Sequence, residues 1–194
     1  MTTYQQRWLL TSASQARVAN RNAPSFDGDA NRSGHYLMVS NAAFGTFSNA
    51  ETALNFPNPG MYLKNSYQSC VMQFDYYISS PKLADRSYSL SVRIGRDRTD
   101  WSTVYYIAQA WSLNGWSKAY AHIGERNSQF MADIVGHLDN SRTSAMAVDN
   151  IQFVNCSMPA PLGPNQQCPS GQFMCRKYRF CVSNDALCNY KNDW

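Results

Sequence analysis

Six cysteines are the residues of this chain whose type and spacing most clearly imply chemistry. Two lie in the body of the chain and four crowd into its end with the spacing C-x6-C-x5-C-x6-C: Cys70 and Cys156, then Cys168, Cys175, Cys181 and Cys188. Zinc ribbons and fingers use close C-x2-4-C pairs, and the three histidines are far from the four tail cysteines in sequence. The pattern therefore favours disulfides over zinc, and dense disulfides indicate an oxidising compartment.

A bridge between Cys70 and Cys156 would close a long loop in the body of the chain. The chain-entropy account credits such a loop with about 4–5 kcal/mol, less any native strain. Such a bridge would tie the start of the clearest predicted strand to the end of the last one.

Three aspartates, Asp27, Asp29 and Asp149, are candidate ligands for a hard cation in the body of the chain. Ca²⁺ takes six to eight oxygen ligands, several of them carboxylate. The sequence leaves open whether the three converge on a cation or accept hydrogen bonds in turns. No other cofactor is expected.

Motifs for catalysis are missing from the sequence. It contains no G-x-S-x-G, no H-E-x-x-H and no phosphate-cradling glycine loop. Jelly-roll glycosidases need two facing carboxylates, yet Glu51 and Glu125 are the only glutamates, and the acid-x-acid spacing occurs only at Asp27-Gly-Asp29. We therefore expect a protein that is not an enzyme.

Aromatic residues gather around the turn signal Asn114-Gly115, and the candidates for binding among them are Trp111, Trp116 and Tyr120. Exposed rings there could stack on sugars or anchor a protein partner; the alternative is core packing. Separately, Asn31-Arg-Ser33 matches the N-glycosylation sequon and lies in a polar loop, so Asn31 is a candidate glycosylation site.

Short strands must position these residues. Hydrophobic residues alternate with polar ones along Cys70–Ile78 and Tyr88–Ile94, which indicates strands with one buried face. Further strands are predicted at Tyr36–Val39, Trp101–Ala110, Trp116–Ile123, Phe130–Val135 and Ala145–Val154. No window of ten or more residues has a persuasive helical period. The fold class is therefore all-β, an antiparallel sandwich or jelly roll.

Composition sets the domain plan and excludes some partners. Of 194 residues, 15% are charged, and the net charge of +4 is scattered without a basic run, so nucleic-acid binding is not expected. There is neither an apolar stretch of membrane-spanning length nor a signal peptide at Met1, so we expect any export signal upstream of this chain. The expected units are a sandwich over 1–156, a proline-rich linker over 157–167 and a disulfide-rich tail over 168–194.

The body resembles the MAM domain, a jelly-roll sandwich of receptor ectodomains, adhesion proteins and secreted proteases. The resemblance rests on Trp8, on Ser33-Gly-His-Tyr-Leu37, on Cys70-Val-Met-Gln-Phe-Asp-Tyr-Tyr77 and on the segment from Ala145 to Cys156, in which Asn150 stands where a second aspartate is usual. The family has a further cysteine pair upstream of Trp8 that this chain lacks, so the chain is expected to begin inside the domain.

The tail resembles the opening half of an LDL-receptor class A module, through Cys168-Pro-Ser-Gly-Gln-Phe-Met-Cys175 and Phe180-Cys181-Val. The resemblance implies a Cys168–Cys181 bridge, with the usual partners of Cys175 and Cys188 absent. It also implies a partial Ca²⁺ site with side-chain ligands Asn189 and Asp193, completed only in an intact protein.

Together the two resemblances imply an extracellular, non-catalytic module of a larger receptor or secreted protein. Its partner would be another extracellular protein, including a second copy of the same protein in homophilic adhesion. Two alternatives stay open: a carbohydrate-binding module with an aromatic platform, and an accessory domain of a secreted protease whose catalytic part lies elsewhere.

Overall fold

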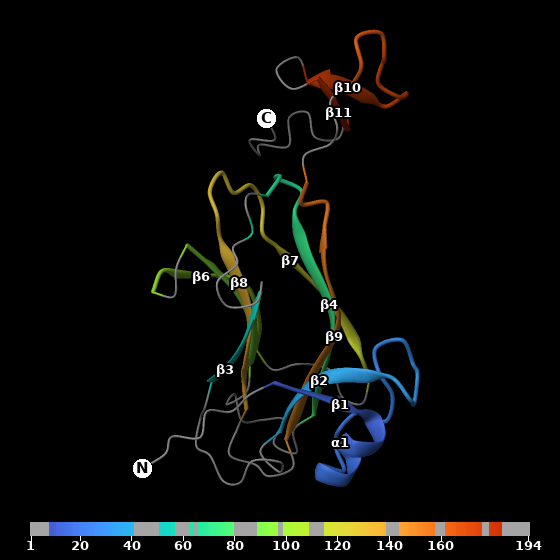
Figure 1. The fold of residues 1–194 in the computed structure, drawn as a ribbon, viewed down its shortest axis with the longest axis vertical. Helices are drawn as coiled ribbons and strands as arrows, with labels where there is room; N and C mark the ends of the chain where they lie inside the picture. Colours follow the sequence, from blue (N-terminus) through green and yellow to red (C-terminus); the bar gives the residue numbers. More distant parts are fainter. Residues whose placement is uncertain are drawn as a thin grey trace.

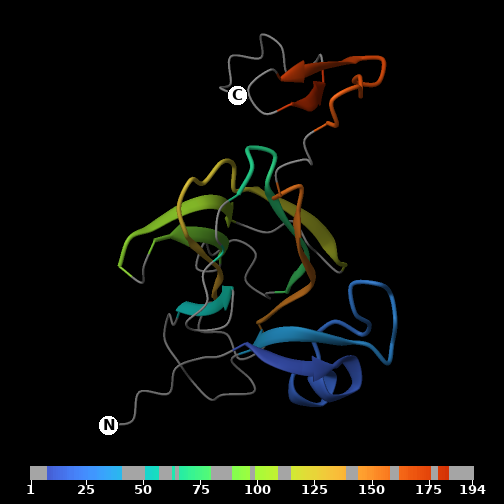
Figure 2. The same ribbon diagram turned by 45° about the horizontal axis from the view of Figure 1, so that its top comes forward.

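Two antiparallel sheets face each other as a sandwich, which confirms the predicted fold class (Figures 1 and 2). The computed structural model describes residues 8–40, 51–56, 63, 66–79, 89–96, 99–108, 115–138, 144–157, 162–175 and 179–183. The five-stranded sheet has the order β1 (Leu9–Ser12), β2 (His35–Ser40), β9 (Ala145–Val154), β4 (Val71–Ser79) and β7 (Ser117–His122). The four-stranded sheet has the order β3 (Glu51–Phe56), β8 (Met131–His137), β5 (Ser89–Gly95) and β6 (Trp101–Ala108).

The core fills the space between the two sheets. Its largest fully buried side chains there include Phe74, Met72, Leu90 and Ile134. Gly136 on β8 shows how tightly this layer is packed, because a Cβ there would lie 2.8 Å from the sulfur of Met146 and 3.1 Å from the Trp8 ring. Trp8 thus packs directly onto the backbone of the opposite sheet, and the interior leaves no room for an added methyl group.

A short helix, α1 (Ala13–Ala19), is a feature that the sequence reasoning missed. It begins with a capping box in which Ser12 and Gln15 satisfy each other's backbone amides. Its buried face, Ala13 and Ala16, packs on a second apolar cluster with Tyr36 and Tyr77. With seven residues it is too short to show a helical period over ten or more residues.

The helix and the loop after it cover one half of the outer face of the five-stranded sheet. Tyr36 on β2, Tyr77 on β4 and Ala147 on β9 are buried beneath them. The sequence predicted that only one face of the Cys70–Ile78 strand is buried; in the structure Asp75 and Tyr77, on its other face, are buried as well. On the other half of this outer face, described side chains such as Tyr120 and Gln152 are exposed.

One buried ion pair holds the four-stranded sheet together across neighbouring strands. Arg93 on β5 pairs in register with Asp133 on β8, and its Nε and Nη2 donate to the two carboxylate oxygens over 3.1 and 2.8 Å. The Asp133 side chain is 1% exposed, and the guanidinium lies 5.2 Å from the centroid of the Trp101 ring. This fork gives the buried carboxylate two charge-assisted hydrogen bonds.

The segment that follows the sandwich contains the two-stranded hairpin β10 (Gln172–Cys175) and β11 (Phe180–Ser183). Both views place this hairpin outside the two sheets (Figures 1 and 2). A disulfide joins Cys168 to Cys181, and another joins Cys70 to Cys156 at the end of the sandwich. Both are the pairings expected from the sequence and its resemblances.

Candidate functional site

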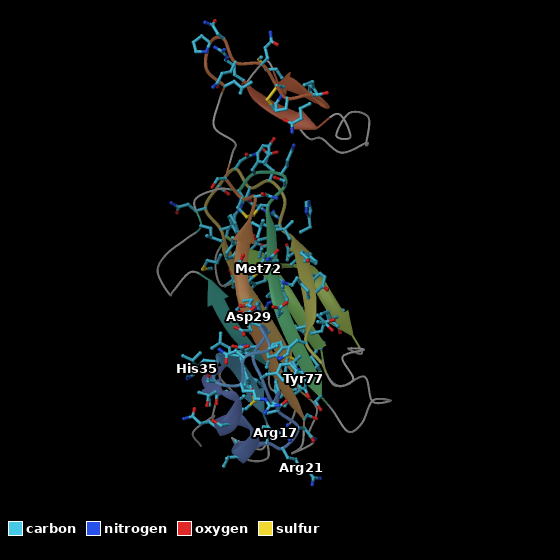
Figure 3. All side chains as sticks on the ribbon, turned by 90° about the vertical axis from the view of Figure 1, so that its right-hand side faces the viewer. Arg17, Arg21, Asp29, His35, Met72 and Tyr77 are labelled. Carbon is cyan, nitrogen blue, oxygen red and sulfur yellow. A yellow bond between two sulfur atoms is a disulfide. The ribbon has the colours of Figure 1, made fainter. Side chains whose placement is uncertain are left out.

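Four aspartates approach one another where the loop after α1 crosses the five-stranded sheet. Asp27 and Asp29 come from this loop, while Asp75 on β4 and Asp149 on β9 are direct cross-strand partners. Figure 3 shows Asp29 over the middle of the sheet, and Tyr77 and Arg17 toward the end that α1 covers. The sequence named three of these carboxylates and missed Asp75.

A β-bulge in β9 brings Asn150 into the centre of these aspartates. The pairing of β4 with β9 shifts by one residue between Gln73 and Asp75, and Asn150 in the bulge has φ of 51°. Asparagine tolerates this left-handed conformation better than most residues. Its side-chain Nδ2 donates to Oδ1 of Asp29 over 3.0 Å and to Oδ2 of Asp75 over 2.8 Å.

Backbone amides engage the remaining carboxylate oxygens. Asp149 accepts from the N–H of Gly28 at 2.9 Å and of Asn150 at 2.8 Å, and Asp27 accepts from the N–H of Asp29 and Asn31. Lys118 lies 3.4 Å from the other oxygen of Asp75. Gly28 is required at this close approach, because a Cβ there would lie 2.9 Å from Nδ2 of Asn150.

Burial raises the pKa of Asp149, and the nearby charges of Asp27 and Asp29 raise it further. The two backbone hydrogen bonds oppose this by favouring the charged form, which lowers the pKa. Within the described ranges, no group of three histidine, cysteine or acidic side chains is arranged to hold a metal ion. N–H groups donate to each of the four aspartates, and cation binding by Asp27, Asp29 and Asp149 stays a prediction.

The predicted aromatic cluster divides into a buried and an exposed part. Trp116 is half-buried, donates from its ring N–H to the carbonyl of Phe26 over 2.8 Å and packs edge-on against Tyr36. Trp116 therefore packs within this cluster, and its role in binding stays a prediction. Tyr120 on β7 is 58% exposed on the outer face of the five-stranded sheet. Trp111 lies outside the described residues.

The open half of the outer face of the five-stranded sheet carries a row of polar and aromatic side chains, which we call the open face. Tyr120 pairs with Gln73 on β4, which pairs with Gln152 on β9, and His122 and Val71 pair in the next row. Gln152 and His122 are exposed, whereas Gln73 and Val71 are half-buried. Adjacent strands therefore present one continuous, mixed surface.

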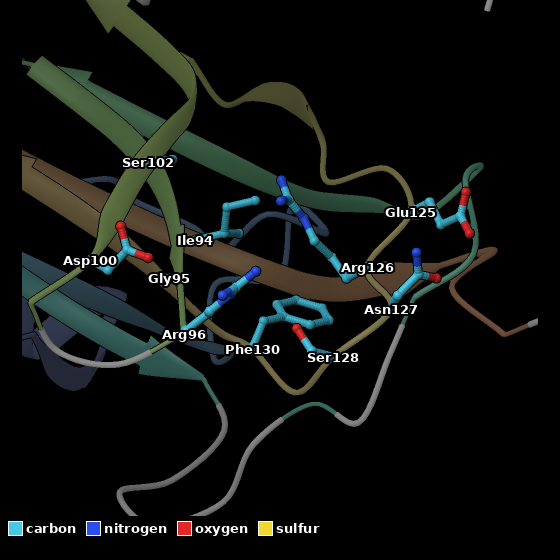
Figure 4. Close-up of a pocket in the computed structure, with 10 residues that line it drawn as sticks. All are labelled: Ile94, Gly95, Arg96, Asp100, Ser102, Glu125, Arg126, Asn127, Ser128 and Phe130. Carbon is cyan, nitrogen blue, oxygen red and sulfur yellow. The ribbon is translucent and has the colours of Figure 1, made fainter. Parts of the chain in front are cut away.

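A polar cavity of about 480 Å³ lies at one edge of the sandwich, where the end of β5 meets the segment between β7 and β8 (Figure 4). It is lined by Ile94, Gly95, Arg96, Asp100, Ser102, Glu125, Arg126, Asn127, Ser128 and Phe130. Arg96 directly follows β5 in the sequence. Nothing in the sequence signals that Arg126, thirty positions later, lines the same cavity.

The predicted tail ligands Asn189 and Asp193 lie outside the described residues, as does Cys188. Cys175 is the last residue of β10. Asn31 is exposed, and its Oδ1 accepts from the hydroxyl of Ser33 over 2.9 Å, so the sequon lies at the surface. In the described part of the chain, no helix has the length and apolar character needed to cross a bilayer.

Comparison with solved structures finds matches of low sequence identity, among them the following three. The K1 cleaved adhesin domain of Lys-gingipain from Porphyromonas gingivalis W83 is 9% identical with a TM-score of 0.49, over 80% of this chain and 87% of that one. The K2 cleaved adhesin domain of Lys-gingipain is 13% identical with a TM-score of 0.47, over 78% and 85%. The module TmCBM61, solved with β-1,4-galactotriose, is 6% identical with a TM-score of 0.42, over 76% and 88%. These similarities are too distant to support an inference about function.

Comparison with protein families gives a specific result. The family model described as "MAM domain, meprin/A5/mu" matches residues 1–157. These residues include both sheets of the sandwich and the Cys70–Cys156 disulfide. This match covers more than half of the chain and agrees with the jelly-roll type of sandwich. The chain belongs to the MAM domain family.

Proposed function

We propose that this chain is a non-catalytic, extracellular interaction module that binds a protein partner through the open face. The observation that carries the proposal is the exposed Tyr120 beside Gln73 and Gln152, on a sheet whose other half is already covered. Tyrosine is enriched at the energetic centres of protein interfaces because it offers apolar area and a polar tip. Membership of the MAM family and the two disulfides support the extracellular location.

The open face favours a protein partner over a sugar. Sugar-binding sandwiches rely on a flat row of aromatic rings, and here Trp116 points into the packed cluster with Tyr36. Tyr106 is 61% exposed but belongs to β6 in the other sheet. Within the described part of the open face, Tyr120 therefore has amide and imidazole neighbours in place of a second ring.

We also propose that residues 168–194 form the opening part of an LDL-receptor class A module, joined to the sandwich by the linker 157–167. The support is the bridge between the first and third tail cysteines, which closes around the β10–β11 hairpin. Ca²⁺ binding by Asn189 and Asp193 belongs to this proposal and requires the acidic ligands of a complete module.

The binding proposal is tested with cells that bind the purified, labelled chain. Tyr120→Ser is expected to weaken binding about tenfold or more while leaving the melting temperature unchanged. Tyr106→Ser is the matched control, because it removes an equally exposed tyrosine from the opposite sheet. Protease treatment of the cells should abolish binding and glycosidase treatment should not.

The opposite result, binding that survives protease but not glycosidase, would contradict the protein partner and favour the carbohydrate alternative. Sedimentation of the purified chain separates homophilic from heterophilic contact. Self-association that Tyr120→Ser removes would identify the partner as a second copy.

A further inference from the structure

The polar cavity between β5 and the β7–β8 connection has the chemistry of a binding site distinct from the open face. We propose that it binds an acidic sugar, with Arg96 and Arg126 holding a single carboxylate. The two arginines come from opposite walls, one just after β5 and the other after β7 (Figure 4). Guanidinium groups match carboxylates through paired N–H donors.

Arg126 is held in place by its backbone. Its N–H and carbonyl both pair with Ser66, and the Ser66 hydroxyl donates to the carbonyl of Gly124 over 2.7 Å. Gly124 takes a φ of 71°, which turns the chain out of β7 toward the cavity. The arginine is therefore presented on a fixed frame, and binding a ligand does not require this segment to become ordered first.

The Arg126 side chain lacks an acceptor. Its Nε is buried and has no hydrogen-bond partner among the described residues. Within the same part of the chain, the ion pairs found join Arg93 to Asp133 and Lys118 to Asp75, and neither involves Arg96 or Arg126. A buried donor without an acceptor is unfavourable. An anionic ligand would remove that cost if the guanidinium of Arg126 reorients to donate hydrogen bonds to it.

Charge limits the ligand to one negative group. Asp100 and Glu125 also line the cavity, so the two positive charges are balanced by two negative ones. A polyphosphate or a sulfated polymer would face these carboxylates, whereas a ligand with one carboxylate and several hydroxyls can pair with the arginines and donate to the acids.

The remaining walls suit a sugar ring. Ser102, Asn127 and Ser128 supply groups that both donate and accept hydrogen bonds, as vicinal hydroxyls require. The side chains of Ile94 and Phe130, 3% and 4% exposed, form an apolar floor for ring C–H groups. A cavity of about 480 Å³ falls within the range of small-molecule sites and has room for a single sugar.

The test is an NMR titration of the isotope-labelled chain with D-glucuronate, and with D-glucuronamide as its neutral counterpart. We expect saturable amide shifts at residues 94–96, 102 and 125–128 with glucuronate, and a Kd on the order of 1 mM. Glucuronamide is expected to bind at least about tenfold more weakly, because it lacks the charge that both arginines recognise.

Variants assign the effect to the cavity. Arg96→Gln and Arg126→Gln are each expected to weaken glucuronate binding about tenfold. Arg32→Gln, which removes an exposed charge from a loop on the other sheet, is the control and should bind like the parent. If Arg126→Gln does not fold, Arg96→Gln decides the question, because the Arg96 side chain is exposed.

Two results would overturn the proposal. One is equal binding of glucuronate and glucuronamide, or the absence of saturable shifts in the cavity. The other is tighter binding of N-acetyl-aspartic acid amide, a peptide-like carboxylate, which would assign the cavity to an acidic side chain of a protein.

Discussion

The side-chain amide of Asn150 lies 2.8 Å from the carboxylate of Asp75 and donates a hydrogen bond to it across the strands β9 and β4. The same amide donates to Asp29 from the loop that covers the sheet. One neutral donor therefore links two acidic residues in a place where a cation or a third carboxylate could otherwise stand. Substitutions of Asn150 therefore test how much this donor stabilises the aspartate cluster.

Asn150→Asp is expected to lower the free energy of unfolding by about 2–4 kcal/mol in the presence of EDTA. The change removes two hydrogen bonds to charged acceptors and adds a fifth carboxylate to the four of the cluster. Millimolar Ca²⁺ should restore part of this loss in the variant and stabilise the parent chain less. Chemical denaturation measures both effects.

Asn155→Asp is the matched control for this variant. Asn155 also has a positive φ, 55°, but it is exposed and lies beyond the end of β9. If both variants lose the same stability, backbone conformation and not the aspartate cluster controls the effect.

The Cys70–Cys156 disulfide should contribute about 2–5 kcal/mol to stability, because its loop spans 86 residues and the bridge is enclosed at Cys70. The double variant Cys70→Ala/Cys156→Ala is expected to lose this free energy of unfolding and therefore to melt at a lower temperature. Cys168→Ala/Cys181→Ala removes the tail bridge and should leave the melting of the sandwich unchanged. A drop of equal size in both double variants would show that the tail supports the sandwich.

The Arg93–Asp133 pair predicts strong non-additivity. Arg93→Met removes the guanidinium from the buried Asp133 carboxylate and should lower the free energy of unfolding by about 3 kcal/mol. Asp133→Leu removes the carboxylate from Arg93 and should have an effect of similar size. The double variant Arg93→Met/Asp133→Leu should cost less than either single change, because no uncompensated charge is left. Urea denaturation of the four proteins gives the coupling energy, and additive losses would contradict the prediction.

The raised pKa of Asp149 predicts a pH dependence of stability. Because its folded pKa lies above the ordinary 3.8, the folded state holds the proton more tightly than the unfolded chain does. The contribution of Asp149 to stability is therefore greatest below both pKa values and decreases as pH rises through the folded pKa. As the pH falls through the folded pKa toward 3.8, the parent chain should gain stability relative to Asp149→Asn. Carboxyl ¹³C titration of Asp149 checks the shift directly, and a midpoint at or below 3.8 would contradict it.

The strongly alternating strands could be predicted from the sequence, and the edge elements could not. The patterns in Cys70–Ile78 and Tyr88–Ile94 predicted β4 and β5 to within one residue at each end. The four-residue β1 is too short for a clear period, and its Leu9 and Leu10 are exposed, the reverse of what a buried strand would show. The edge strand β3 at Glu51–Phe56 was not predicted; it has only six residues, and Pro57 follows it directly.

The acidic cluster was predictable only in part, because a bulge decides its geometry. Antiparallel pairing of the strand that begins after Cys70 with the strand that ends before Cys156 brings Asp75 near residues 149–151 without further information. The sequence does not reveal that one extra residue in β9 turns Asn150 toward Asp75. The cavity at Arg96 and Arg126 was beyond sequence reasoning, since it forms only where two separate connections meet.

The position of the Cys70–Cys156 disulfide determines how the sandwich bears mechanical load. The chain leaves β9 at Val154 and meets the bridge two residues later, before it continues toward the tail. Tension applied through the tail therefore reaches a covalent bond to the start of β4 before it can peel β9 from its two neighbours. The force therefore acts on the central strands β4 and β9 together. A pull on the tail is passed to the whole sheet and does not separate β9 from its neighbours one hydrogen bond at a time.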